Sequence, residues 1–160
     1  GGLPLGALIG KASVVNGLPK GSLGGTYSGN PVACAAANAT LDIMEADDVW
    51  QSAKHYAETI QTPISQWQQE GISPWLFGLT GIGAMRGIEL RHPEHDVHPS
   101  VMAQVLVQAR KRGLLLMPSG QYRHIIRLLP PLTIEPDTLK EGLDILKEVL
   151  IALPDGLPAA

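Results

Sequence analysis

The sequence has a single cysteine, only seven aromatic residues (three Trp, three Tyr and one Phe) and no excess of basic side chains. Because Cys34 has no second cysteine to pair with, an intramolecular disulfide is excluded and a reducing compartment is favoured. The formal charge of −3 and the scarcity of aromatics argue against a surface that neutralises phosphates and stacks on bases. We therefore expect no nucleic-acid partner.

Long hydrophobic runs are also missing. No stretch approaches the roughly 18 continuous apolar residues of a membrane-spanning helix. The apolar opening over residues 3–9 differs from a signal peptide, because Lys11 follows it instead of preceding it. These absences predict a soluble, cytoplasmic protein with no membrane partner.

The length of 160 residues, 44% of them apolar, is that of one compact domain with room for an appendage. Residues 5–9, an apolar run bounded by glycines, predict a short buried strand. Residues 16–30 contain five glycines and one proline and are expected to form a loop.

Two helices are predicted next. Asn30-Pro31 is a typical helix start, and the alanine-rich residues 31–46 predict a helix in close contact with another backbone segment. Apolar residues at helical spacing between 49 and 67 predict a second helix to about Glu70, which Pro63 should kink or divide.

From residue 75 the pattern changes to short apolar segments broken by glycines, which predicts a hairpin over residues 75–90. A helix over 101–112, strands over 114–117 and 124–129, and a last amphipathic helix from about residue 136 complete the prediction. The expected fold class is α+β, with helices packed on a small, mostly antiparallel sheet from about residue 48.

Two features could bind a ligand. The glycine-rich loop Gly24–Asn30 carries hydroxyls into a helix N-terminus, where unpaired N–H groups and the helix dipole favour an anion such as phosphate, although a plain turn is an alternative. Arg127 is the only Lys, Arg, Asp or Glu in the apolar segment 124–134, HIIRLLPPLTI, so it needs a carboxylate partner. That partner is either a protein Asp or Glu or the carboxylate of a substrate.

The histidines of the segment HPEHDVH, His92, His95 and His98, could supply ligands to Zn²⁺ or Ni²⁺. Their spacing in a proline-flanked loop does not fix a coordination geometry, so a solvated polar connector is the favoured interpretation. We predict no metal site and leave a metal-binding protein as an alternative.

Four segments in order, GGLPLGALIG, GGTYSGNPVACAAANATLDIME, GIGAMRGIEL and IIRLLPPLTI, resemble the C-terminal part of a class III pyridoxal-phosphate aminotransferase. That group includes 4-aminobutyrate, ornithine, acetylornithine and diaminobutyrate aminotransferases. The resemblance implies part of a homodimeric fold type I enzyme that moves an amino group from an amino acid to a 2-oxo acid. It further implies a remnant of the large cofactor domain with its strand and loop over 1–30, a connecting helix over 31–47 and the small C-terminal domain over 48–160.

The resemblance also assigns roles to single residues. Thr26, flanked by Gly25 and Tyr27, matches the position that reaches the cofactor phosphate of the other subunit, and Arg127 matches the arginine that holds the substrate carboxylate. The family's Schiff-base lysine lies a few residues before the first glycine pair, so this chain contains no catalytic residue by family position. We expect the complete enzyme, and not this chain alone, to bind pyridoxal 5'-phosphate and to be active.

The donor expected from the family is an ω-amino acid such as 4-aminobutyrate. A rival hypothesis is a naturally short, non-catalytic binding or assembly module with the same fold.

Overall fold

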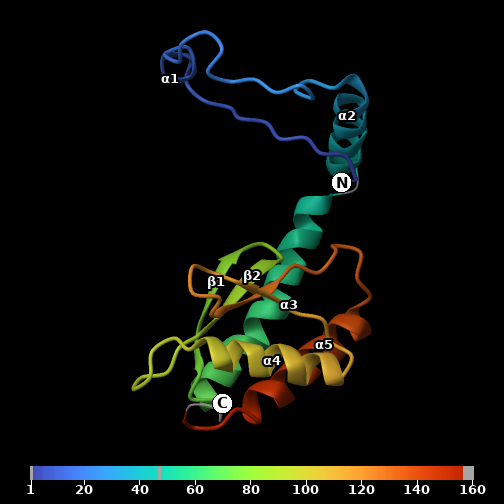
Figure 1. Ribbon diagram of the computed structural model, residues 1–160. Helices are drawn as coiled ribbons and strands as arrows, with labels where there is room; N and C mark the ends of the chain where they lie inside the picture. The colour runs from blue at the N-terminus through green and yellow to red at the C-terminus, as the bar shows by residue number, and fades with distance from the viewer. Residues whose placement is uncertain (1, 47, 157–160) are drawn as a thin grey trace. The chain divides into compact units, whose positions relative to one another are not determined.

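The computed structural model describes residues 2–46 and 48–156, which form two compact units divided between Val49 and Trp50 (Figure 1). Each unit is described by itself. No helix in the described part of the chain is both long and apolar enough to cross a membrane.

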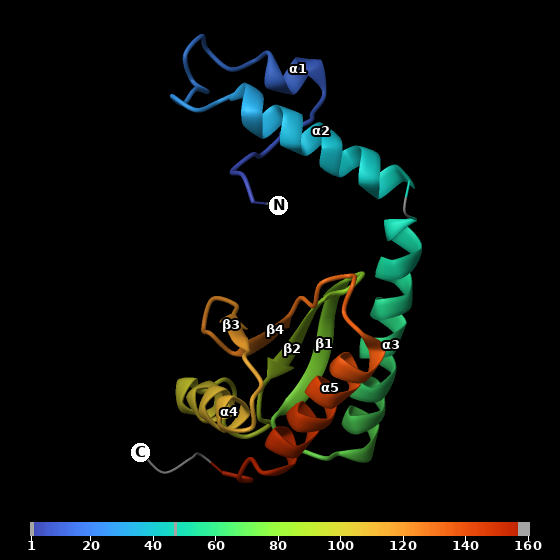
Figure 2. The ribbon, with the colours of Figure 1, turned by 90° about the vertical axis from the view of Figure 1, so that its right-hand side faces the viewer.

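The first unit is built on a 16-residue helix, α2 (Pro31–Ala46), preceded by one short turn of helix, α1 (Ala12–Val15) (Figure 2). Asn30 begins α2, because its side-chain Oδ1 accepts hydrogen bonds from the backbone N–H groups of Val32 and Ala33 at 3.0 and 3.1 Å. Residues between Leu3 and Ala7 and the small residues of α2 line a shared groove.

The strand predicted over residues 5–9 is wrong. Within residues 2–46 the structure contains no strand, and the side chain of Ile9 is 95% exposed. A strand is stable only where a neighbouring strand accepts its backbone hydrogen bonds, and the first unit offers none.

The second unit begins with α3 (Val49–Glu70), a continuous helix that contains Pro63. The prediction that Pro63 divides the helix is therefore wrong. Buried residues lie on both sides of the proline, namely Tyr56, Ala57, Ile60, Ile64 and Trp67. Their packing offsets the roughly 3 kcal/mol that a proline costs inside a helix.

The sheet has four strands in the order β1-β2-β4-β3, and all three pairings are antiparallel. The strands are β1 (Leu76–Ile82), β2 (Met85–Leu90), β3 (Met117–Ser119) and β4 (Ile125–Leu128). β1 and β2 form the predicted hairpin, and β4 confirms the strand expected over 124–129. The strand expected over 114–117 is wrong except for its last residue, because Leu114 and Leu116 pack against the core instead of pairing.

Two further helices, α4 (Pro99–Lys111) and α5 (Pro136–Ile151), share one hydrophobic core with α3 and the sheet (Figure 2). All these elements contribute core residues that are at most 1% exposed, and Trp75 before β1 joins them: Ile60, Ile64, Trp75, Ile88, Val101, Val105, Ala109, Ile126, Leu146, Val149 and Leu150. The expected α+β class, helices on a small antiparallel sheet, is thus confirmed for the described residues.

Candidate functional site

Arg127 lies on β4, opposite Gly87 of β2 on one side and Met117 of β3 on the other. Its neighbour Ile126 is fully buried in the core, so the alternation of a strand turns Arg127 to the opposite face of the sheet. Arg127 is exposed, and among the described residues its guanidinium has no hydrogen bond or ion pair. The alternative in which a protein carboxylate of this chain holds Arg127 therefore finds no support in residues 2–46 and 48–156.

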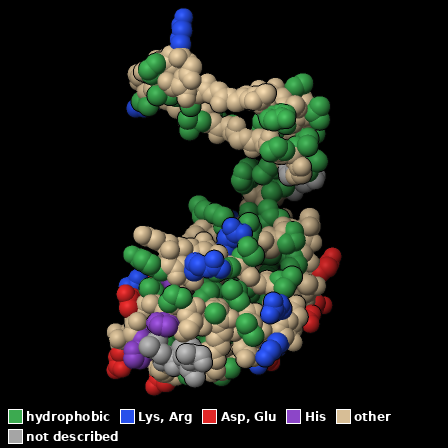
Figure 3. Space-filling view, in the orientation of Figure 1, with side chains coloured by type: hydrophobic (Ala, Val, Ile, Leu, Met, Phe, Trp, Pro, Cys, Tyr) green, Lys and Arg blue, Asp and Glu red, His purple; other side chains and the backbone are tan. Residues whose placement is uncertain are grey.

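We call the side of the sheet that carries Arg127 the outer face. The strand register places on it Thr80, Ile82, Met85, Gly87, Glu89, Met117, Ser119, Ile125 and Arg127. Ile82, Met85 and Met117 are 80%, 50% and 57% exposed, an arrangement in which a cation stands among apolar side chains. Figure 3 shows basic side chains lying among hydrophobic ones over this sheet.

At Gly87, directly opposite Arg127, any side chain would force its neighbours to shift. A Cβ atom there would lie 2.8 Å from Ile125 Cγ2 and 2.9 Å from Thr80 Oγ1, closer than real Cβ contacts. The missing side chain lets Ile125 and Thr80 close over β2 beside Arg127.

Three charged or titratable residues of the same region were missed by sequence reasoning: Glu89, Arg91 and His124. The Glu89 carboxylate lies 3.1 Å from the Arg91 guanidinium and 3.7 Å from His124 Nε2. The hairpin register could have found Glu89, because it lies two residues after Gly87 and therefore on the same face. Arg91 and His124 lie beyond the ends of their strands, where no periodicity predicts a side-chain direction.

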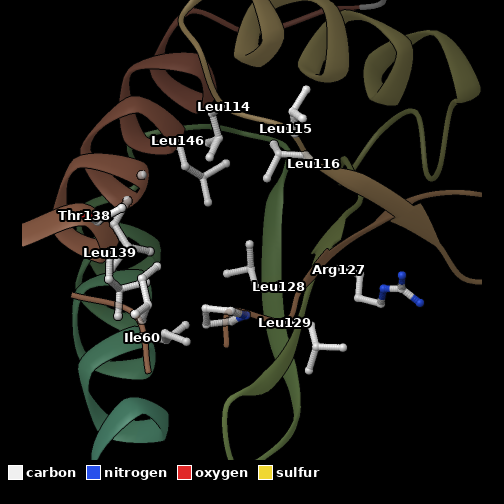
Figure 4. Close-up of a pocket in the computed structure, with 14 residues that line it drawn as sticks. Ile60, Leu114, Leu115, Leu116, Arg127, Leu128, Leu129, Thr138, Leu139 and Leu146 are labelled. Atoms are coloured by element: carbon white, nitrogen blue, oxygen red, sulfur yellow. The ribbon is translucent and has the colours of Figure 1, made fainter. Parts of the chain in front are cut away.

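An apolar pocket of about 270 Å³ lies behind β4, between that strand, α5 and the segment after α4 (Figure 4). Leu114, Leu116, Leu128, Leu139 and Leu146 are among its lining residues. The side chain of Arg127 points away from this pocket (Figure 4). Arg127 is nevertheless one of the residues that line the pocket.

The loop before α2 presents Thr26 and Tyr27 to solvent. It turns through backbone hydrogen bonds from Ser28 N–H to the Gly25 carbonyl at 3.0 Å and from Asn30 N–H to the Tyr27 carbonyl at 3.2 Å. The expectation of unpaired N–H groups at the start of α2 is wrong for Val32 and Ala33, whose N–H groups donate to the Asn30 side chain. An anion at this loop would instead contact Thr26 and the glycine backbone before it.

The three histidines of the β2–α4 connection have separate structural roles. His92 is buried and its Nδ1 accepts a hydrogen bond from the Glu94 backbone N–H at 3.1 Å, while His95 stacks on it with ring centroids 4.7 Å apart. His98 caps α4 by accepting from the Ser100 N–H. Across the described ranges, no group of three His, Cys, Asp or Glu side chains is placed to hold a metal ion.

Comparison with known proteins connects these features to one family. The family model described as aminotransferase class-III matches residues 1–150. The chain is 50% identical over 153 residues to a 2-aminoadipate transaminase of Pseudomonas putida, and 34% identical over 150 residues to the 4-aminobutyrate aminotransferase GabT of Escherichia coli. These alignments cover 96% and 92% of the chain.

Solved structures of the same kind of enzyme share the fold. An acetylornithine aminotransferase from Elizabethkingia anophelis aligns with a TM-score of 0.70 at 24% identity, over 89% of this chain and 34% of its own. An ornithine aminotransferase from Toxoplasma gondii, whose structure shows partial occupancy of pyridoxal phosphate, aligns with a TM-score of 0.70 at 22% identity, over 90% of this chain and 32% of its own.

The fold corresponds to a part of fold type I aminotransferases, which depend on pyridoxal phosphate. The chain belongs to the class III aminotransferase family. It spans 37% and 35% of the lengths of the two curated relatives named above, or about a third of a family member.

Proposed function

We propose that this chain is the C-terminal part of a cytoplasmic, homodimeric aminotransferase that moves an amino group from an amino acid to a 2-oxo acid. In this proposal residues 48–160 form the small C-terminal domain, 31–47 the connecting helix and 1–30 a remnant of the large cofactor domain. The observation that carries the proposal is Arg127, an exposed guanidinium without a partner in the described chain, within a sequence of this family.

Arg127 has the chemistry to hold a substrate carboxylate. A guanidinium presents two parallel N–H donors that match the two carboxylate oxygens, and the rigid strand β4 fixes where they point. The exposed apolar side chains beside it lower the competition from water once a substrate covers them. Holding the carboxylate at one end orients the reacting amine at the other.

Thr26 is proposed to contact the phosphate of the cofactor bound by the other subunit, with Gly25 and Tyr27 beside it. The exposed Thr26 supplies a hydroxyl and Gly25 lets the backbone approach closely, a donor set that fits a phosphate. Pyridoxal phosphate, when bound, supplies the electron sink of the reaction. The Schiff-base lysine of the family precedes the position of Gly1, so we propose that the 160-residue chain is inactive alone.

The donor is proposed to be an amino acid with a carboxylate some distance from the reacting amine. The ω-amino acid 4-aminobutyrate fits this description, and it is the donor expected from the resemblance. The 50% identity to a 2-aminoadipate transaminase supports 2-aminoadipate as the second candidate. In both molecules a terminal carboxylate lies three or four bonds from the carbon that bears the amine, within reach of one anchoring arginine.

The test is made on the complete subunit, with Arg127→Lys and Arg127→Ala assayed against two donors, one with the carboxylate and one amine without it. Arg127→Lys keeps the charge but loses the planar two-point contact, and Arg127→Ala loses both. A charge-assisted hydrogen bond is worth about 1.5–3 kcal/mol, so kcat/KM for the carboxylated donor should fall about ten- to a hundredfold.

The uncarboxylated amine is the matched control and should be much less affected by either substitution. Melting temperatures of the variants complete the comparison. Equal losses on both donors, together with a large fall in melting temperature, would remove Arg127 from the substrate site and assign it a structural role.

A further inference from the structure

Arg127 has an acidic neighbour that it does not touch. The pairs Gly87–Arg127 and Glu89–Ile125 follow one another along β2 and β4, so Glu89 and Arg127 lie diagonally on the outer face. Diagonal neighbours in an antiparallel pair are about 7–8 Å apart, within reach of long side chains. Opposite charges at this spacing attract, yet no ion pair joins them.

The Glu89 carboxylate is instead held from the other side. Its Oε1 accepts a hydrogen bond from Arg91 Nε at 3.1 Å, and the same oxygen lies 3.1 Å from Arg91 Nη2, which makes a two-point contact. His124 Nε2 lies 3.7 Å from that oxygen. The side chains of Glu89 and His124 are only 18% and 11% exposed, so both are largely withdrawn from solvent.

Arg91 is itself fixed by two further contacts. Its Nη1 lies 3.2 Å from the Asp96 carboxylate, and its guanidinium stands 5.3 Å from the centre of the Phe77 ring. The contact with the Phe77 ring and the two carboxylate contacts limit the rotamers that Arg91 can adopt. A fixed Arg91 therefore fixes the carboxylate that it binds.

We propose that Arg91 and His124 are positioning residues that hold Glu89 away from Arg127 and so keep the Arg127 guanidinium free. This inference rests on the proposed function, in which Arg127 receives a substrate carboxylate. A carboxylate tethered next to Arg127 would compete with every incoming substrate carboxylate. Binding Glu89 elsewhere on the sheet removes that competitor without removing its charge from the fold.

The experiment measures how fast an arginine-specific dicarbonyl, phenylglyoxal, modifies Arg127 in the 160-residue chain, by peptide mass mapping of initial rates. Arg110, which is exposed and has no ion pair among the described residues, serves as the internal reference. Arg91→Gln should release Glu89 to pair with Arg127. Because exposed ion pairs are worth about 0.2–1 kcal/mol, Arg127 modification should slow by up to about fivefold.

The rescue variant is Arg91→Gln combined with Glu89→Gln, which should return the Arg127 rate to that of the unmodified chain. Glu89→Gln alone should leave the rate unchanged, since Glu89 does not contact Arg127 in the native arrangement. His124→Ala should slow it in the same direction as Arg91→Gln. Arg112→Gln, which removes a contact to Glu148 elsewhere, is the matched control and should have no effect.

The proposal is overturned if Arg127 reacts at the same rate or faster in Arg91→Gln, or if the slowing persists when Glu89 is also replaced. Faster modification of Arg127 in Glu89→Gln alone also overturns the proposal. That variant keeps every positively charged residue, so a faster rate would show that Glu89 already contacts Arg127 in the native arrangement. The readout needs neither cofactor nor substrate. If the Arg127 variants lost activity equally on the carboxylated and the uncarboxylated donor, the proposed function would be rejected, but the phenylglyoxal result would still stand.

Discussion

Asn30 shows at the residue scale how one side chain decides the course of the loop into α2. Its Oδ1 satisfies two of the N–H groups that a helix leaves unpaired at its start. The same contact removes those N–H groups from any ligand. The proposed contact of this loop with a phosphate therefore rests on Thr26 and its neighbours Gly25 and Tyr27, and not on the start of α2.

Replacing Asn30 with Ala should destabilise α2 by about 1 kcal/mol, because N-cap asparagine to alanine costs about 0.5–2 kcal/mol. Asn38→Ala is the matched control: Asn38 is exposed inside α2, where alanine is the better helix former and should be neutral or slightly stabilising. Urea unfolding followed by far-UV circular dichroism measures both. Equal effects of the two substitutions on the free energy of unfolding would show that the Asn30 side chain does not stabilise the start of α2.

Gly81 is the residue on which the β1–β2 hairpin depends. Its φ of +102° is strained for any other residue, and a Cβ atom would lie 2.2 Å from the Met85 carbonyl oxygen. Gly81→Ala should therefore destabilise the second unit by about 1–3 kcal/mol through the strained φ alone, and the clash of the Cβ atom adds to this loss. Gly78→Ala, where a Cβ meets nothing within 4 Å, should have little effect on the denaturation midpoint; a similar loss there would show that the hairpin geometry is not the cause.

At the scale of elements, sequence patterns predicted α2, the hairpin, α4, β4 and α5 because each has its own period and its own start and stop residues. The elements that failed depend on contacts far away in the chain. Residues 5–9 form no strand for lack of a partner, and α3 runs through Pro63 because the core holds both of its halves. Local propensity cannot report either circumstance.

The candidate site, too, was predictable only in part from the sequence. Arg127 stands out as a charge in an apolar segment, and the glycine loop stands out by composition. Glu89 and Arg91 are only two residues apart, but the contact of Glu89 with His124 joins two distant segments, so only the assembled sheet brings it about.

The strand that carries Arg127 also places a side chain in the core between the sheet and the helices. Ile126 is completely buried, so Ile126→Ala should cost about 2–5 kcal/mol through lost burial and the cavity left behind. Ile82 is 80% exposed, and Ile82→Ala should change the free energy of unfolding by at most about 0.5 kcal/mol. Chemical denaturation of both variants measures the difference; comparable losses would contradict the assignment of the two faces of the sheet.

At the scale of the whole molecule, the chain is expected to lack a site for a specific covalent bond to pyridoxal phosphate. In the proposed function the family's lysine precedes Gly1, and Lys11, Lys54 and Lys140 of this chain are exposed surface amines. The side-chain hydrogen bond to Asp144 raises the pKa of Lys140, and it also occupies one of the N–H donors of that amine.

Mixing the chain with pyridoxal phosphate, reducing with borohydride and mapping the products by mass should therefore give weak, scattered labelling and no transamination. Asp144→Ala is a useful comparison, since it should raise labelling at Lys140 alone. Stoichiometric labelling of one lysine in the unaltered chain would contradict the expectation that this chain has no catalytic lysine.

The central claim, that this chain is the C-terminal part of an aminotransferase subunit, is tested most directly by the nucleotide sequence immediately upstream of the codon for Gly1. The account predicts a continuous open reading frame that encodes a lysine a few residues before Gly1. A start codon and ribosome-binding site placed directly before Gly1 would contradict the account and favour a short, non-catalytic module with the same fold.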